Sequence, residues 1–154
     1  LPSPCQTMAP CERSAEIAAS TEIIWSFLGD LQRWPEWDPD IKSISEVQGG
    51  LTEGGTFLLH MESMSVPITF RDVRPNESAR WAGSTLSGCV VCEGIFHLQQ
   101  VDAQRTKFDY SFGITGCLGC LVTQMKHKEI VTGVEVGLDN IKKFSEAMAV
   151  QQEL

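Results

Sequence analysis

The chain has 154 residues, of which 42% are hydrophobic and 21% are charged, and its net charge is −8. A chain of this length forms a single domain with a substantial hydrophobic core. Its 12 Lys and Arg residues form no cluster, so no nucleic-acid partner is expected. No apolar run approaches the roughly 20 residues that span a bilayer, and we expect no stable membrane insertion.

The N-terminal segment LPSPCQTMAP lacks the charged and apolar regions of a signal peptide. We interpret residues 1–11 as a tail and residues 12–150 as one domain. A cytoplasmic location is the resulting expectation. No feature of the sequence predicts the oligomeric state.

The domain is expected to begin with a short strand, because the apolar residues over 15–19 alternate with polar ones. Ser20 or Thr21 then provides an N-cap, since a side-chain oxygen there accepts from free amide groups of the first helical turn. The helix that follows carries an apolar face over 24–28. It is predicted to end at the tight Trp-Pro-Glu-Trp corner over 34–37.

Short segments separated by Gly, Pro and Asn indicate an antiparallel sheet after this corner. From Leu118 or Leu121 to about Met148 the apolar spacing becomes helical. Gly133 and Gly137 lie inside this helix and weaken it by about 1 kcal/mol each relative to Ala. Glycines are expected there if the helix passes close to the sheet or a ligand. The predicted strands cover 41–48, 56–64, 66–73, 78–83, 89–101 and 106–115.

The order of strand, helix, WPxW corner and strand over 12–41 resembles the start of the polyketide cyclase/dehydrase and lipid-transport family, a START-like family. GGLTEGGTF resembles the second hairpin of that family, and IFHLQQVDAQRTKFDYSF resembles its paired sixth and seventh strands. VGLDNIKKFSEAM resembles the end of its long C-terminal helix. The resemblance implies an α+β helix-grip fold, in which a curved antiparallel sheet of about seven strands wraps around the C-terminal helix. It also implies a cavity for a hydrophobic small molecule.

Alternation assigns the side chains to the two faces of the sheet, since one face of an antiparallel sheet is usually packed. Pairing the apolar sets of the last two strands places His97 beside Ser111 on the outer face, and the preceding hairpin sets Phe70 opposite Trp81 inside. The expected ligand site combines the inner side chains with one residue of the corner and three of the helix. Its members are Trp37, Phe57, Leu59, Met61, Ile68, Phe70, Trp81, Phe96, Leu98, Phe108, Tyr110, Phe112, Gln124, Met125 and Lys128.

Tyr110 is the candidate catalytic residue, because a buried hydroxyl can donate a hydrogen bond to an enolate or ketone oxygen. It can equally be a core tyrosine whose hydroxyl has a backbone or water partner. The same alternation places His60, Glu93 and His97 on the outer face, and His127 is expected to be solvated. The corner tryptophans, Trp34 and Trp37, either plug the end of the sheet or border the cavity opening.

Two CxxC pairs, Cys89 with Cys92 and Cys117 with Cys120, have a spacing that resembles a zinc ribbon. Against a four-cysteine zinc site, positions i and i+3 of a strand point to opposite faces. A disulfide between the two segments, or free buried thiols, are the alternatives. Cys5 and Cys11 either bridge each other or stay reduced.

The leading functional hypothesis is binding of a polyketide-like or lipid-like molecule between the sheet and the C-terminal helix, without a cofactor. The alternative is a cyclase or dehydratase that folds a reactive substrate, since holding reacting atoms together lowers a barrier without a strong acid or base. Tyr110, with Gln124 or Lys128, would then direct an enolization or a loss of water. A third possibility is a metal- or redox-dependent protein built on the CxxC pairs.

Overall fold

The computed structural model describes residues 9–154. These residues form one antiparallel sheet of seven strands in the order β1-β7-β6-β5-β4-β3-β2, together with a long C-terminal helix. The strands are β1 (Cys11–Ile17), β2 (Ile41–Gln48), β3 (Thr56–Met61), β4 (Ser65–Arg74), β5 (Ser78–Thr85), β6 (Val90–Asp102) and β7 (Arg105–Thr115). The helices are α1 (Thr21–Gly29), η1 (Leu31–Arg33), α2 (Trp34–Trp37) and α3 (Gly119–Gln152).

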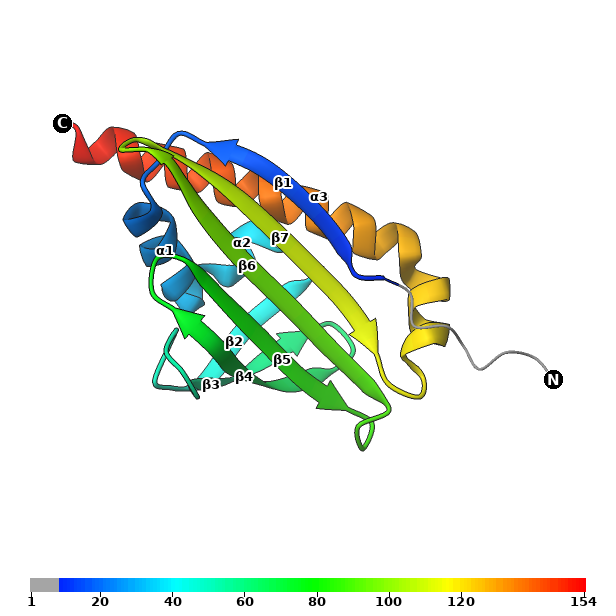
Figure 1. Cartoon of the computed structure of the whole chain (residues 1–154). Helices are drawn as coiled ribbons and strands as arrows, with labels where there is room; N and C mark the ends of the chain where they lie inside the picture. Colours follow the sequence, from blue (N-terminus) through cyan, green and yellow to red (C-terminus); the bar gives the residue numbers. More distant parts are fainter. Residues whose placement is uncertain (1–8) are drawn as a thin grey trace.

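The sheet is curved, and all four helical segments lie on its concave face (Figure 1). The long helix α3 packs along β1 and β7, while α1 and α2 lie between α3 and the rest of the sheet. This is the predicted α+β helix-grip fold. Residues 1–8 of the predicted tail, with Cys5, lie outside the described residues, and Cys11 is the first residue of β1.

The segment between β1 and β2 consists of three short helical pieces instead of one helix ending at the corner. Ser20 caps α1 by accepting a hydrogen bond from the amide of Ile23 at 3.4 Å. The helix ends at Gly29 because Asp30 leaves the helical conformation there. The WPEW sequence itself forms the helical turn α2, since proline is well suited to the first turn of a helix.

The strand register confirms the predicted inner and outer faces. Phe70 lies opposite Trp81, as predicted. The β6–β7 register is displaced by two residues, so that His97 lies beside Asp109 rather than Ser111. An irregularity between Gln100 and Asp102, next to the turn, causes the difference. A displacement of two residues keeps each side chain on its face.

Candidate functional site

The predicted inner side chains of the sheet form one continuous buried cluster. Met61 and Phe112 are partly buried at its margin, and the other sheet residues predicted for the site are at most 5% exposed. The cluster contains no carboxylate or imidazole, as the alternation predicted. The buried members from the sheet are Phe57, Leu59, Ile68, Phe70, Trp81, Phe96, Leu98, Phe108 and Tyr110.

Trp34 and Trp37 fill the centre of the concave face. Both side chains are completely buried. The ring centroid of Trp34 lies 5.2–6.1 Å from those of Trp37 and four aromatic residues of the sheet. Its indole Nε1 donates to the carbonyl oxygen of Leu28 at 2.8 Å. Of the two alternatives for the corner tryptophans, the structure shows the plug, so this part of the concave face is filled by side chains.

A groove of about 370 Å³ lies at one end of the concave face, between the start of β1, the end of β7 and the first half of α3. Phe112, Ile114, Ile130 and Val131 provide its apolar surface, and His127 lies at its rim. The complete lining is Ala9, Pro10, Cys11, Glu12, Arg13, Phe112, Gly113, Ile114, Thr123, His127, Ile130 and Val131. Of the residues predicted for the ligand site, Phe112 is the one that lines this groove.

Gln124, Met125 and Lys128 were predicted to face the same cavity as Tyr110, but the structure places them on the exposed surface of α3. The buried stripe of α3 runs through Val134, Leu138 and Ile141. Extending this stripe toward the start of the helix at helical spacing gives 123, 127 and 130 or 131, the positions that line the groove. Counting back from the stripe would therefore have identified them.

Tyr110 lies one inward position deeper along β7 than Phe112, which corresponds to about 7 Å at the rise of a strand. Its ring meets that of Trp37 edge to face, with centroids 5.8 Å apart and planes at 90°. The side chain is 2% exposed. Burial raises the pKa of the Tyr110 hydroxyl well above its ordinary value, and the negative charges of Asp38, Cys11 and Asp40 raise it further. Tyr110 itself is not among the residues that line the groove.

Asp38 is a functional candidate that the assignment of the sheet faces did not include. It follows Trp37 directly, and its Oδ1 accepts from the amide of Asp40 at 3.0 Å. Burial raises the pKa of the Asp38 carboxyl to about 6, and the nearby charge of Asp40 adds to the effect. A carboxyl with such a pKa is a suitable general base or acid near neutral pH. The signal in the sequence was an acidic residue directly after a corner that packs inward.

Two glycines of α3 let the helix approach this corner, whereas the sequence suggested an approach to the sheet or a ligand. A Cβ at Gly137 would lie 3.3 Å from Cε3 of Trp37, and one at Gly133 would lie 3.3 Å from Oδ2 of Asp40. These are tighter than ordinary contacts between side chains. Gly133 and Gly137 therefore bring α3 against the corner that carries Asp38.

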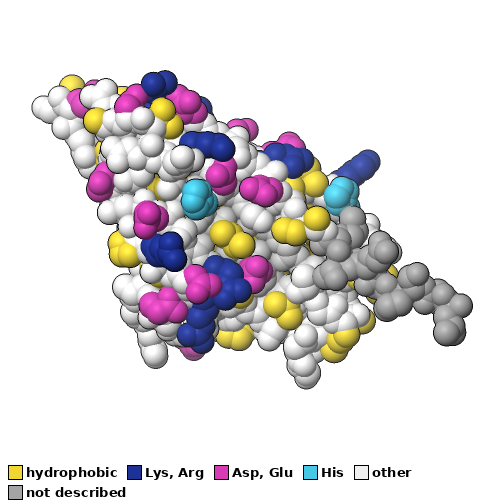
Figure 2. Space-filling view, in the orientation of Figure 1, with side chains coloured by type: hydrophobic (Ala, Val, Ile, Leu, Met, Phe, Trp, Pro, Cys, Tyr) yellow, Lys and Arg dark blue, Asp and Glu magenta, His cyan; other side chains and the backbone are white. Residues whose placement is uncertain are grey.

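The other candidate acid–base groups lie on the outer face of the sheet. His60 Nε2 is 2.6 Å from the Ser45 hydroxyl, and its Nδ1 is 2.8 Å from the Ser65 hydroxyl. His97 Nδ1 lies 3.4 Å from Asp109. Glu93 pairs with Arg80 at 3.4 Å. Figure 2 shows acidic and basic side chains intermixed on this face, without a large area of one sign.

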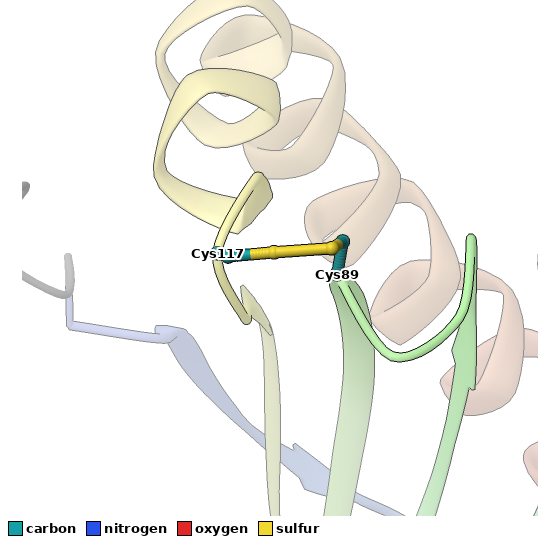
Figure 3. Close-up of a disulfide and its surroundings, with 2 residues drawn as sticks. All are labelled: Cys89 and Cys117. Atoms are coloured by element: carbon teal, nitrogen blue, oxygen red, sulfur yellow. A yellow bond between two sulfur atoms is a disulfide. The ribbon is translucent and has the colours of Figure 1, made fainter.

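A disulfide joins Cys89, before β6, to Cys117, before α3 (Figure 3). Their Cα atoms are 4.7 Å apart. The side chain of Cys92 is buried in the protein interior, and burial raises the pKa of its thiol to about 11. Within residues 9–154, no three Cys, His, Asp or Glu side chains are grouped so that they could hold a metal ion. The arrangement does not support the zinc alternative for Cys89, Cys92, Cys117 and Cys120. None of the helices over 9–154 is long and apolar enough to cross a membrane.

Comparisons with solved structures show the same fold in distant proteins. A hypothetical protein from Helicobacter pylori superposes with a TM-score of 0.75 at 13% identity, covering 93% of this chain and 91% of that one. StfQ, a di-domain ARO/CYC protein from the steffimycin biosynthetic pathway, gives a TM-score of 0.70 at 11% identity. The match covers 94% of this chain and 52% of StfQ. XoxI from Bacillus cereus gives a TM-score of 0.63 at 18% identity, and the match covers 96% of this chain and 99% of XoxI.

A search of curated proteins found no match. A family model does match, and it covers most of the chain. The model, described as polyketide cyclase / dehydrase and lipid transport, matches residues 8–146. Its span includes the corner with Asp38, all seven strands and most of α3. The chain therefore belongs to the polyketide cyclase/dehydrase and lipid-transport family.

Proposed function

We propose that this protein binds a hydrophobic small molecule, polyketide-like or lipid-like, in the groove between β1, β7 and α3. The observation that carries the proposal is the groove itself, which is apolar along Phe112, Ile114, Ile130 and Val131. Its volume of about 370 Å³ is within the range of small-molecule sites. An apolar surface with a few fixed polar groups is the usual composition of such a site.

Apolar contact supplies the affinity in this proposal. Burial of apolar surface contributes about 25 cal/mol per Å², and a dissociation constant of 1 μM corresponds to about 8 kcal/mol. At this value about 330 Å² of buried apolar surface supplies 8 kcal/mol before the cost of association, so a ligand must bury more than this against Phe112, Ile130 and Val131 to reach 1 μM. The family match to polyketide cyclases and lipid-transport proteins supports the same class of ligand.

The second candidate is a cyclase or dehydratase activity, and the position of Asp38 favours it. A carboxyl whose pKa is about 6 is largely ionised at neutral pH and basic enough to accept a proton. In an enolization, Asp38 would take a proton from the carbon next to a ketone while the Tyr110 hydroxyl donates a hydrogen bond to the ketone oxygen. StfQ, which has the same fold, is described as a di-domain ARO/CYC from the steffimycin biosynthetic pathway.

Native mass spectrometry of the protein purified from its own source tests the proposal. The complex should carry an additional mass, and denaturation should release an organic molecule with a hydrophobic skeleton. Recovery of that molecule unchanged after incubation would favour carriage, whereas conversion of an added precursor to a cyclised or dehydrated product would favour the enzyme. A protein that carries no ligand and binds no apolar probe would contradict the proposal.

A further inference from the structure

We propose that the Cys89–Cys117 disulfide controls how tightly the groove holds its ligand, so that the oxidised protein binds and the reduced protein releases. The inference rests on the proposed function and adds a redox regulation to the same site. The disulfide fastens the start of α3, and the first half of α3 forms one wall of the groove (Figure 3). Reduction would free this wall at one end.

The wall that α3 provides has little packing of its own against the sheet. The second half of the helix is anchored in the core through Val134, Leu138 and Ile141, which are at most 5% exposed. Between Cys120 and Val134, the one buried residue of the helix is Thr123. The groove itself separates this stretch from β1 and β7. The stretch therefore depends on its two ends for its position, and few buried contacts mean low local stability.

The end at the start of α3 is fastened to the segment before β6. The Cα atoms of Cys89 and Cys117 are 4.7 Å apart. The amide of Leu118 also donates to the carbonyl oxygen of Cys89 at 2.8 Å. A single hydrogen bond contributes about 0.5–1.5 kcal/mol, whereas a disulfide contributes roughly 2–4 kcal/mol. The disulfide is thus the stronger of these two attachments.

The turn that carries Cys117 is directly connected to the groove lining on both sides. Ile114, three residues earlier, and Thr123, six residues later, both line the groove. Thr123 Oγ1 lies 3.3 Å from the carbonyl oxygen of Ile114 and donates to that of Gly119 at 2.8 Å. A displacement of this turn would therefore move the lining of the groove.

Reduction of the disulfide requires a dithiol, and the bond is accessible to one because Cys117 is exposed. A thiolate of the reductant attacks one sulfur and forms a mixed disulfide, which the second thiol of the reductant then resolves. The reductant leaves as a disulfide, and both cysteines end as thiols. The freed turn gains conformational freedom, which ligand binding must remove again. The reduced protein should therefore bind more weakly.

The test is a titration with N-phenyl-1-naphthylamine, an uncharged fluorescent probe, of the oxidised protein and of the same protein reduced with dithiothreitol. Reduction should raise the dissociation constant at least about fivefold, which corresponds to about 1 kcal/mol. The double variant Cys89→Ser/Cys117→Ser should bind as weakly as the reduced wild type and should not respond to the reductant. Cys92→Ala removes a buried thiol outside the bond and should respond like the wild type. Far-UV circular dichroism at the titration temperature confirms that each protein is folded.

A second measurement does not depend on any variant. Because coupling between two equilibria is reciprocal, saturating probe should shift the disulfide toward the oxidised form by the same factor in a buffer of oxidised and reduced dithiothreitol. Equal affinity of the oxidised and reduced wild type, or tighter binding after reduction, would overturn this inference and leave the proposed function standing. A double variant that binds like the oxidised wild type would also overturn it. If the oxidised wild type did not bind the probe, the proposed function would fail and this inference with it.

Discussion

Trp37 and Tyr110 meet edge to face, with ring centroids 5.8 Å apart and planes at 90°, and this contact joins the corner before β2 to the inner face of β7. Trp37 also contacts α3, where a Cβ at 137 would lie 3.3 Å from its Cε3, closer than an ordinary contact. The contact fixes the position of the next residue, Asp38, relative to the tyrosine hydroxyl. The arrangement of the candidate site thus depends on the packing of one tryptophan.

Asp38→Asn should change how stability depends on pH. The pKa of this carboxyl is raised from 3.8 to about 6 in the folded protein, chiefly by burial. The folded chain therefore holds a proton that the unfolded chain has lost between about pH 4 and 6. The free energy of unfolding of the wild type should fall as pH rises through this interval and stay lower above it. Asn removes this loss and keeps the acceptor for the Asp40 amide.

Urea unfolding at pH 4, 5, 6 and 7.5 measures the effect. Since one pKa unit is worth about 1.4 kcal/mol, we expect Asp38→Asn to be about 1–3 kcal/mol more stable than the wild type at pH 7.5. The two proteins should be nearly equal at pH 4. Asp139→Asn is the control, because Asp139 is exposed on α3. Parallel pH profiles for Asp38→Asn and the wild type would contradict the assignment.

Gly94→Ala should destabilise the protein. Gly94 lies opposite Trp81 in the β5–β6 pair, and the indole of Trp81 covers it so closely that a Cβ would overlap ring atoms. Trp81 cannot move aside, since its ring centroid lies 5.4 Å from that of Trp34 and 5.8 Å from that of Phe112. Forcing extra volume into a packed core costs about 1–3 kcal/mol.

Thermal unfolding monitored by circular dichroism checks this cost. Gly29→Ala is a suitable comparison, because its Cβ would lie 3.8 Å from Leu51, an ordinary contact. Ala is the better helix former by about 1 kcal/mol, so Gly29→Ala should be as stable as the wild type or more so. An unfolding temperature of Gly94→Ala equal to that of the wild type would show that Trp81 does not lie on Gly94.

The disulfide between Cys89 and Cys117 should be recovered from the purified, oxidised protein. Non-reducing digestion and mass spectrometry should yield one cross-linked peptide containing both residues, which are 28 positions apart. Closing a loop of this length contributes roughly 2–4 kcal/mol, so the double variant Cys89→Ser/Cys117→Ser should unfold at a lower urea concentration. Separate, alkylated peptides would contradict the bond. Disulfides persist in oxidising compartments, and the expectation of a cytoplasmic location does not account for this one.

The sheet could be predicted well from the sequence because its side chains alternate with a period of two. Phe70 opposite Trp81 and the inward position of Tyr110 both followed from that alternation. The β6–β7 register could not be predicted in the same way, because the irregularity before Asp102 has no clear signature in the sequence. The error did not change which face each side chain occupies, because a displacement of two residues preserves the face.

The candidate site was harder to predict because it depends on contacts between distant elements. The apolar wall suggested an open cavity, but Trp34 and Trp37 occupy its centre, and no local pattern indicates how far a corner inserts. The face of α3 was misjudged at Gln124 and Lys128 for a simpler reason. The stripe through Val134 and Ile141 already indicated 123, 127 and 130 or 131.

A titration with N-phenyl-1-naphthylamine, an uncharged apolar probe that fluoresces when bound, tests the location of the ligand site most directly. The wild type should bind it with a dissociation constant on the order of 1–10 μM. Val131→Trp fills the groove and should weaken binding at least about tenfold, a loss of about 1.4 kcal/mol. Val150→Trp makes the same substitution at an exposed position near the end of α3 and should bind like the wild type. Equal affinity of Val131→Trp and the wild type, or no binding by any of the three, would contradict a ligand site between β1, β7 and α3.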